Sequence, residues 1–247
     1  MTFSPIRLVT FDILHTLITP RWPIHVQYAM AFEPHLGVRL DPNAIKSSFK
    51  TALKSVQKEK PAYAQGSHGW WTDVIERTAL GAGANPEILD ASLENIAASL
   101  MKRFSSREGY QDFSDAIPTI DALHQRGIYT AVISNSDARS RLVLKDLEFP
   151  DSMVPIVLSE QEGIEKPTPE IFLRTLERVS TLRGERITAG QTIHVGDELD
   201  ADYRGAEKAG MTALLLRRPG AEGDGNEDLQ GVKVIQGLDQ VLHYAEY

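Results

Sequence analysis

The chain has 247 residues, of which 42% are hydrophobic, and its 34 acidic and 26 basic residues give a formal net charge of -8. This charge argues against a polyanionic partner such as nucleic acid, and the only tight basic cluster, Arg217-Arg218, is too small to change that. Without cysteine the chain has no disulfide, thiolate metal site or cysteine nucleophile. Its apolar runs are shorter than a membrane span. A strand-like run begins almost at once, which leaves little room for a targeting segment. We expect a soluble cytoplasmic or nuclear protein.

An apolar run at residues 7–11 opens the chain and predicts a strand that ends at Asp12, within "VTFDILHTL". The stretch from about Thr19 to Tyr110 has helical patterns and no evident strand. The helices predicted there span residues 24–35, 42–58, 70–80 and 86–104. This stretch has the size of a small second domain.

The rest of the chain alternates between strand-like and helical patterns. The predicted strands span residues 129–134, 154–158, 192–195 and 212–216, and the predicted helices span residues 116–125, 138–147, 169–179 and 201–209. Such alternation predicts a doubly wound, Rossmann-like α/β fold with a mainly parallel sheet. We expect an α/β core domain of residues 1–18 and 111–247 and a helical domain of residues 19–110. Because ligands of open α/β sheets bind at the carboxyl ends of the strands, the helical insert would act there as a lid. Residues 219–228, "PGAEGDGNED", predict a polar acidic loop.

Asp12, Ser134, Lys166 and Asp197 all fall at or just past the ends of predicted strands. Four acids also crowd into "HVGDELDAD" between Asp197 and Asp202, and crowded carboxylates repel one another unless a cation is present. Their oxygens are ligands that suit Mg²⁺. Lys166 could stabilise negative charge, Ser134 could donate a hydrogen bond to a substrate, and Asp12 could attack as a nucleophile.

Each of these residues also has an ordinary structural explanation. The two aspartates at strand ends could cap helices or loops, Ser134 could belong to a turn, Lys166 could be a solvated surface charge, and the acidic run could be an exposed helix N-terminus. Taken together and in this order, they favour a functional site. His194 lies inside a predicted strand and is interpreted as a packing residue. The pair Trp70-Trp71 is interpreted as packing rather than substrate-contacting.

At this point the sequence resembles the haloacid dehalogenase superfamily of hydrolases across essentially its whole length. The segments "FDILHTL", "VISNSD", "EKPTPEIF" and "HVGDELDADYRGAEKAGM" resemble the four motifs of that family in order, and the fourth is the most specific. The helical insert resembles the family's C1 cap. Two details, the segment "SHGWWTDVI" and the leucine at position 14 of the first motif, resemble one subgroup of the family. That subgroup has little assigned chemistry.

The resemblance implies that Asp12 attacks phosphorus to form an aspartyl-phosphate, with a small phosphorylated molecule as substrate and Mg²⁺ as cofactor. Asp202 would either belong to the metal surroundings or anchor Lys166, and both possibilities stay open. The cap also offers His68 and the Trp70-Trp71 pair as specificity candidates. The site residues expected on this basis are Asp12, Ser134 and Lys166 for catalysis; Asp12, the carbonyl of Leu14, and Asp197 for Mg²⁺; Asn135, His15 and Arg21 for substrate; and Thr16, Gly196 and Asp202 as supporting residues.

The departure in the first motif is Leu14, which occupies the position of the family's general acid/base aspartate and cannot transfer a proton. A missing general acid removes a factor of about 10² to 10⁴ in rate, or about 3 to 5 kcal/mol of barrier stabilisation. Acyl and aryl phosphates, whose leaving groups are weak bases, would suffer least. His15, beside Leu14, could substitute as the acid/base, but an adjacent residue at a strand end normally points the other way.

Three alternatives to a phosphatase-like enzyme follow. Leu14 favours a binding or regulatory protein that keeps the metal and phosphate site without catalysis and has a protein partner. A second alternative is hydrolysis of a carbon–halogen bond, since haloacid dehalogenases also lack the general acid/base aspartate of the first motif. The resemblance implies, however, that those enzymes work without metal and carry fewer acids in the fourth motif, so this alternative ranks lower. The weakest is a scaffold role for the insert or the acidic loop.

Overall fold

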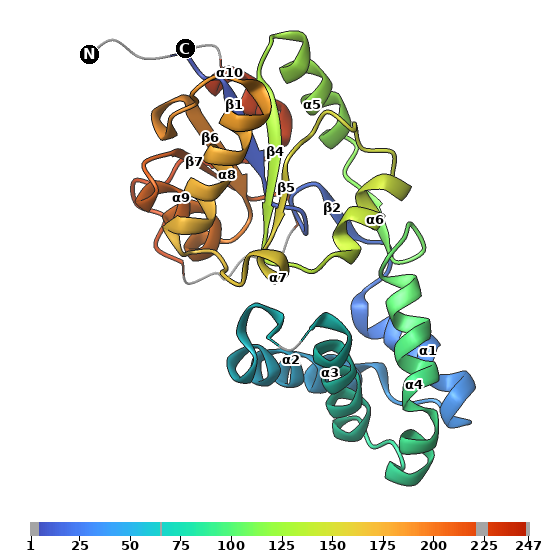
Figure 1. The fold of residues 1–247 in the computed structure, drawn as a ribbon. Helices are drawn as coiled ribbons and strands as arrows, with labels where there is room; N and C mark the ends of the chain where they lie inside the picture. The colour runs from blue at the N-terminus through green and yellow to red at the C-terminus, as the bar shows by residue number, and fades with distance from the viewer. Residues whose placement is uncertain (1–4, 65, 221–226, 246–247) are drawn as a thin grey trace. The chain divides into compact units, whose positions relative to one another are not determined.

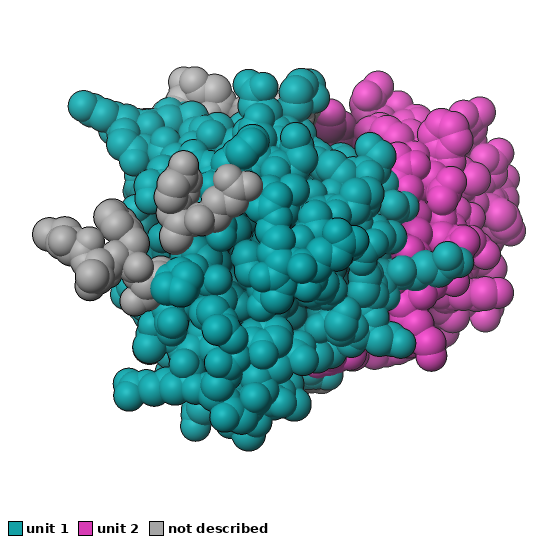
Figure 2. Space-filling view, turned by 90° about the horizontal axis from the view of Figure 1, so that it is seen from above, with its two compact units in different colours: residues 1–19, 112–136, 148–247 teal, residues 20–111, 137–147 magenta. Residues whose placement is uncertain are grey.

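The computed structural model describes residues 5–64, 66–220 and 227–245. The chain divides into two compact units, which Figure 2 shows in different colours. The first comprises residues 1–19, 112–136 and 148–247, and the second comprises residues 20–111 and 137–147. Within the predicted acidic loop, residues 221–226 lie outside the described part of the chain. Of the helices that the structure describes, none has the length and hydrophobicity to span a bilayer.

The first unit is built on a six-stranded parallel sheet with the strand order β5-β4-β1-β6-β7-β8 (Figure 1). Its strands are β1 (Leu8–Phe11), β4 (Tyr129–Ser134), β5 (Ile156–Leu158), β6 (Thr192–Gly196), β7 (Thr212–Leu216) and β8 (Val234–Ile235). In β1, Phe11 lies opposite Val132 of β4 on one side and Val195 of β6 on the other. Strands β1, β4 and β6 are almost continuously buried, as expected where helices cover both faces of a parallel sheet. The predicted α/β fold is confirmed.

The helices of this unit are α5 (Ala116–Gln125), α7 (Ser159–Glu162), α8 (Pro169–Arg183), α9 (Gly205–Lys208) and α10 (Val241–Tyr244), with 3-10 turns η2 (Ala189–Gln191) and η4 (Leu238–Gln240). In the main core, Phe172 of α8 packs with Leu8 and Ile133 of the sheet. From β1 the chain moves outward to β4 and β5, and α8 then returns it to β6 on the other side of β1. The winding therefore reverses at β1, and the carboxyl ends of β1, β4 and β6 border the crevice where such sheets bind ligands.

The predicted helix at residues 201–209 is wrong in its first half. A π-helical turn, η3 (Leu199–Arg204), precedes the short helix α9. The backbone N–H groups of Asp202 and Tyr203 both donate to the carbonyl of Glu198, at 2.9 and 3.2 Å. This wider turn buries Leu199 and Tyr203 in the apolar core while Asp202 approaches the backbone of Gly196. π-Helical turns are often found at functional sites.

The second unit contains α1 (Ile24–Leu36), α2 (Pro42–Glu59), α3 (Ser67–Gly81), α4 (Pro86–Arg103) and α6 (Arg139–Asp146), with a 3-10 turn η1 (Pro61–Tyr63). The Asp41 side chain caps α2, the Asn85 side chain caps α4, and each helix starts with proline, which has no N–H to satisfy. Its core is mostly aliphatic and includes aromatic rings, of which Tyr28 and Phe32 lie edge to face at 5.7 Å. The four helices predicted in the insert are present.

The prediction that no strand lies between Thr19 and Tyr110 is wrong at both ends of that range. Strands β2 (Ile18–Pro20) and β3 (Tyr110–Asp112) form a two-stranded sheet. Both are short and mostly not buried, so they carry no apolar alternation, and their pairing joins distant parts of the chain.

The predicted domain boundaries had left residues 137–147 in the α/β domain, whereas they group with the helices of the second unit. Within that unit the Asp137 carboxylate accepts a hydrogen bond from Trp71 Nε1 at 2.7 Å, and the Arg139 guanidinium lies 4.8 Å from the centre of the Trp71 ring. These contacts join α6 to α3. They also explain the Trp70-Trp71 pair, since Trp70 is buried and donates through Nε1 to the Lys60 carbonyl.

Candidate active site

Asp12 follows β1 at the carboxyl end of the sheet and is 7% exposed. Its N–H donates to the Val195 carbonyl at 2.9 Å, which extends the pairing of β1 with β6 to this residue. Its Oδ1 accepts a hydrogen bond from Lys166 Nζ at 2.7 Å. Burial raises the pKa of Asp12, while Lys166 and Ser134 oppose that shift.

Lys166 joins two buried carboxylates. Besides Asp12, its Nζ contacts Asp202 Oδ1 at 2.5 Å. Burial alone would lower the pKa of Lys166, but the two carboxylates outweigh it, so the pKa lies above its usual range. Asn135 holds the Lys166 backbone from both sides: its Nδ2 donates to the Lys166 carbonyl at 2.9 Å, and its Oδ1 accepts from the Lys166 N–H at 2.8 Å. The second and third sequence motifs therefore meet at this lysine.

Asp202 accepts three hydrogen bonds. Its Oδ1 faces Lys166 Nζ and His194 Nε2, the latter at 3.1 Å, and its Oδ2 accepts from the Glu198 N–H at 2.9 Å. Burial acts to raise the pKa of Asp202, but Lys166 and His194 outweigh it and hold the pKa below its usual range. A Cβ at Gly196 would lie 2.1 Å from Asp202 Cγ, so only glycine leaves room for this carboxylate. The geometry is that of an anchor for Lys166.

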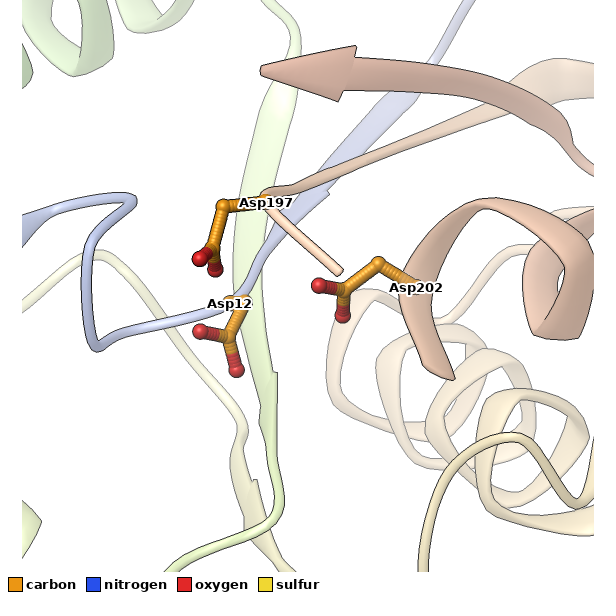
Figure 3. A group of neighbouring side chains, drawn as sticks. All are labelled: Asp12, Asp197 and Asp202. Atoms are coloured by element: carbon orange, nitrogen blue, oxygen red, sulfur yellow. The ribbon is translucent and has the colours of Figure 1, made fainter. Parts of the chain in front are cut away.

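Asp12, Asp197 and Asp202 form a carboxylate cluster, in which one oxygen from each lies within 4.8 Å of the others. Figure 3 shows that Asp12 and Asp197 follow two neighbouring strands and that Asp202 comes from the helical segment beside them. Burial, and then the charges of Asp12 and Asp202, raise the pKa of Asp197 to about 8. Among the ion pairs of the described residues, none includes Asp197. Lys166 pairs with the other two carboxylates, so three carboxylates share one ammonium. Carboxylate oxygens at this spacing fit a hard divalent cation such as Mg²⁺.

A cavity of about 950 Å³ in the first unit opens beside Asp197, and its lining includes His15, Glu198, Arg217 and Arg218. His15 has a positive φ of 61°, in the left-handed region that a side chain rarely adopts, and its N–H donates to the Ile18 carbonyl at 2.7 Å. This tight turn places His15 at the cavity.

The remaining predicted residues are less directly connected to the carboxylates. Leu14 is partly exposed and forms an isolated bridge with Ile18. Thr16 is buried; its carbonyl accepts from Arg218 Nη2 at 3.0 Å, while its hydroxyl has no hydrogen-bond partner within the described ranges. Arg21 belongs to the second unit, where its Nε donates to the Arg107 carbonyl at 2.9 Å. Substrate contacts of Arg21, His15 and Asn135 stay predictions.

Sequence reasoning missed the contributions of two groups of residues to this site. Thr10 and His194 are polar residues fully inside apolar strands, and the His194 ring links Thr10 to Asp202. Arg217 and Arg218 follow β7, another strand end. Arg217 donates to the Asp197 carbonyl, and Arg218 pairs with the Asp115 carboxylate through both Nη1 and Nη2, each at 2.9 Å. The available signal was a polar side chain inside or directly after a buried strand.

The comparisons with known proteins agree with this geometry. A family model described as haloacid dehalogenase-like hydrolase matches residues 6–210. The chain is 34% identical over 222 residues to haloacid dehalogenase-like hydrolase domain-containing protein 3 of Homo sapiens, covering 87% of this chain and 84% of that protein.

Two solved structures are similar in fold. One is 2-haloacid dehalogenase from Pseudomonas syringae, with a TM-score of 0.64 and 23% identity over 96% of this chain and 97% of that one. The other is an HAD phosphatase from Thermococcus onnurineus, with a TM-score of 0.62 and 22% identity over 98% of each chain. Because the family model spans most of the sequence, including all four motifs and the site they form, the chain belongs to the haloacid dehalogenase-like hydrolase family.

Proposed function

We propose that the protein hydrolyses a small phosphorylated molecule in a Mg²⁺-dependent reaction that passes through an aspartyl-phosphate at Asp12. The observation that carries this proposal is the Asp12 carboxylate at the end of the central strand, 2.7 Å from Lys166 Nζ and within the cluster that includes Asp197. Asp12, the Leu14 carbonyl and Asp197 would hold the ion. When bound, Mg²⁺ supplies positive charge that stabilises the transferring phosphoryl group.

The residues of the chain then have separate roles. An Asp12 carboxylate oxygen bonds to phosphorus as the bond from phosphorus to the leaving oxygen breaks. Lys166 already donates to Asp12, and the Ser134 hydroxyl acts to lower the pKa of the same carboxyl, so both would stabilise charge that develops beside it. Water then attacks the aspartyl-phosphate, which releases inorganic phosphate and restores the carboxylate.

Leu14 restricts which leaving groups can depart. Its side chain has no proton to give, so the leaving oxygen departs as an anion unless solvent protonates it. Acyl and aryl phosphates are therefore the favoured substrate class, because their leaving groups are weak bases.

We further propose that residues 19–110 serve as a C1 cap contributing Arg21 to specificity, and that the protein acts in the cytoplasm or nucleus.

Leu14 also supports a second candidate, a binding or regulatory protein that keeps the phosphate and metal site and turns over no substrate. Dehalogenation is a less favoured third, because halide leaves without a proton but the reaction does not need the crowded carboxylates at Asp197 and Asp202. Burial, and then the charges of Asp12 and Asp202, raise the pKa of Asp197, and a group of neighbouring carboxylates suits a cation better than a metal-free reaction.

The test is phosphate release by the purified full-length protein, with Mg²⁺ and then with EDTA, from acetyl phosphate, p-nitrophenyl phosphate and sugar monophosphates. We expect Mg²⁺-dependent turnover that favours the first two and is abolished in Asp12→Asn. Leu14→Asp should raise turnover of the sugar phosphates by about 10² to 10⁴. No turnover by a folded, Mg²⁺-binding protein would support the binding function, and halide release from 2-chloropropionate would support the dehalogenase.

A further inference from the structure

A buried chain of hydrogen bonds leads from the middle of the sheet to the nucleophile. Thr10 Oγ1 lies 2.8 Å from His194 Nδ1, and His194 Nε2 lies 3.1 Å from Asp202 Oδ1. The same Oδ1 contacts Lys166 Nζ, which in turn contacts Asp12 Oδ1. All five side chains are buried. This chain of hydrogen bonds joins the neighbouring strands β1 and β6 to the third and fourth sequence motifs.

The partners on each side of His194 decide where its proton lies. A carboxylate is an acceptor only, so Asp202 Oδ1 requires a donor at His194 Nε2. Thr10 can donate its single hydroxyl proton either to His194 Nδ1 at 2.8 Å or to the Ile193 carbonyl at 3.3 Å, and the shorter contact is the better bond. A neutral ring with its proton on Nε2 satisfies both neighbours. The opposite tautomer would set a lone pair against the Asp202 carboxylate.

The ring is also held in one orientation. Phe172 of α8 packs edge to face with His194 at a centroid distance of 5.1 Å and an interplanar angle of 87°. Both side chains are buried. The packing fixes the plane of the imidazole, and Thr10 fixes its tautomer, so the donor at Nε2 is preorganised toward Asp202.

We propose that His194 is a positioning residue, whose Nε2–H holds Asp202 where that carboxylate fixes the Lys166 ammonium against the nucleophile Asp12. This inference rests on the proposed function of Asp12, and it assigns His194 and Thr10 roles beyond strand packing. His194 contacts neither the nucleophile nor a substrate. It acts only through the Asp202 carboxylate, which in turn holds the Lys166 ammonium. Residues that orient a metal ligand or a catalytic group act in the same indirect way.

The experiment compares matched variants of the full-length protein. His194→Gln can keep an N–H donor near the position of Nε2, whereas His194→Met removes it at similar size. We expect His194→Met to lower kcat for p-nitrophenyl phosphate by about 10- to 100-fold with little change in KM, and His194→Gln to restore most of the loss. Thr10→Val, a near-isosteric change in β1, should cause part of the same loss and Thr10→Ser should not. A folded His194→Met protein with the kcat of the wild type would overturn the proposal.

A spectroscopic measurement separates this inference from the proposed function. In ¹⁵N-labelled wild-type protein, the His194 ring should give the signal of a neutral imidazole protonated at Nε2, and the Lys166 ammonium should give a slowly exchanging signal that weakens in Thr10→Val. A ring protonated at Nδ1 alone would overturn the proposal whether or not the protein has activity. If the wild type has no phosphatase activity but both signals are as expected, the proposed function fails and the positioning role stands.

Discussion

Gly196→Ala tests how tightly the site is packed, because one methyl group should displace the Asp202 carboxylate. The added Cβ would lie 2.1 Å from Asp202 Cγ and 2.2 Å from its Oδ2. Ordinary contact begins at 3.4 Å, so the carboxylate must move by about 1.3 Å, the difference between the two distances. Because Gly196 does not have a positive φ, alanine meets this steric contact and no backbone strain.

A movement of that size removes Asp202 from its partners. The 2.5 Å contact with Lys166 Nζ and the 2.9 Å contact with the Glu198 N–H would both exceed hydrogen-bonding distance. Hydrogen bonds to charged groups contribute about 1.5 to 3 kcal/mol each, so the loss of both should lower the free energy of unfolding by about 3 to 6 kcal/mol. Lys166 would lose its anchor, and turnover should fall with it.

The assay is urea-induced unfolding followed by circular dichroism, together with Mg²⁺-dependent phosphate release. Gly190→Ala is the matched control, since Gly190 lies in the turn before β6, in the same unit, and an added Cβ there would meet no atom within 4 Å. If Gly196→Ala unfolds at the same urea concentration as Gly190→Ala and keeps the activity of the wild type, the close packing of Asp202 on Gly196 is refuted.

Three further variants probe the charges of the protein. Asp197→Asn should stabilise the metal-free protein by on the order of 1 kcal/mol, because it removes a partly buried charge beside like charges; urea unfolding checks this. The same change should weaken Mg²⁺ binding, which calorimetry checks. Lys166→Met leaves two carboxylates buried without their cation and should lower the free energy of unfolding by about 3 to 5 kcal/mol, a loss that adding Asp202→Asn should partly reverse. For Asp137, burial raises the pKa but the Arg139 guanidinium outweighs it, so the folded pKa is below the ordinary 3.8. The Asp137 carboxylate therefore contributes to the free energy of unfolding above pH 3.8, and this contribution is lost as the pH falls through the folded pKa. The difference in free energy of unfolding between the wild type and Asp137→Asn should be largest at pH 7 and shrink below a pH of about 4.

The fold and the approach of the four motifs could be predicted because both depend on local patterns and on the geometry of parallel sheets. A buried strand followed by an acid is visible in "VTFDILHTL", and strands that are neighbours in a doubly wound sheet end at the same edge. Asp12, Ser134 and Asp197 therefore had to lie close together once the strands were assigned.

What the sequence could not show was how the charges are paired. Lys166 lies 154 residues after Asp12 in the chain, and the pattern left open whether Asp202 serves a metal or this lysine. The short contact between Asp202 and Lys166 depends on the π-helical turn η3, which looks like ordinary helix in sequence. His194 looked like a packing residue for the same reason, because its partners come from other elements.

The energetics of this cluster bear on why the site exists in a chain with leucine at position 14. The side chains of Asp12, Lys166 and Asp202 are 10%, 2% and 1% exposed, and buried ion pairs of this kind stabilise a fold no better than apolar residues of the same size. Asp197, which is partly buried, adds a further carboxylate beside these charges, at a cost to stability. The fold alone therefore gives no reason for this arrangement, whereas a cation would offset its excess negative charge and a phosphoryl group would use its fixed donors. Under the proposed function, Leu14 would remove proton transfer to the leaving group and so narrow the range of leaving groups, while Asp12 and its charged neighbours would support the same class of reaction.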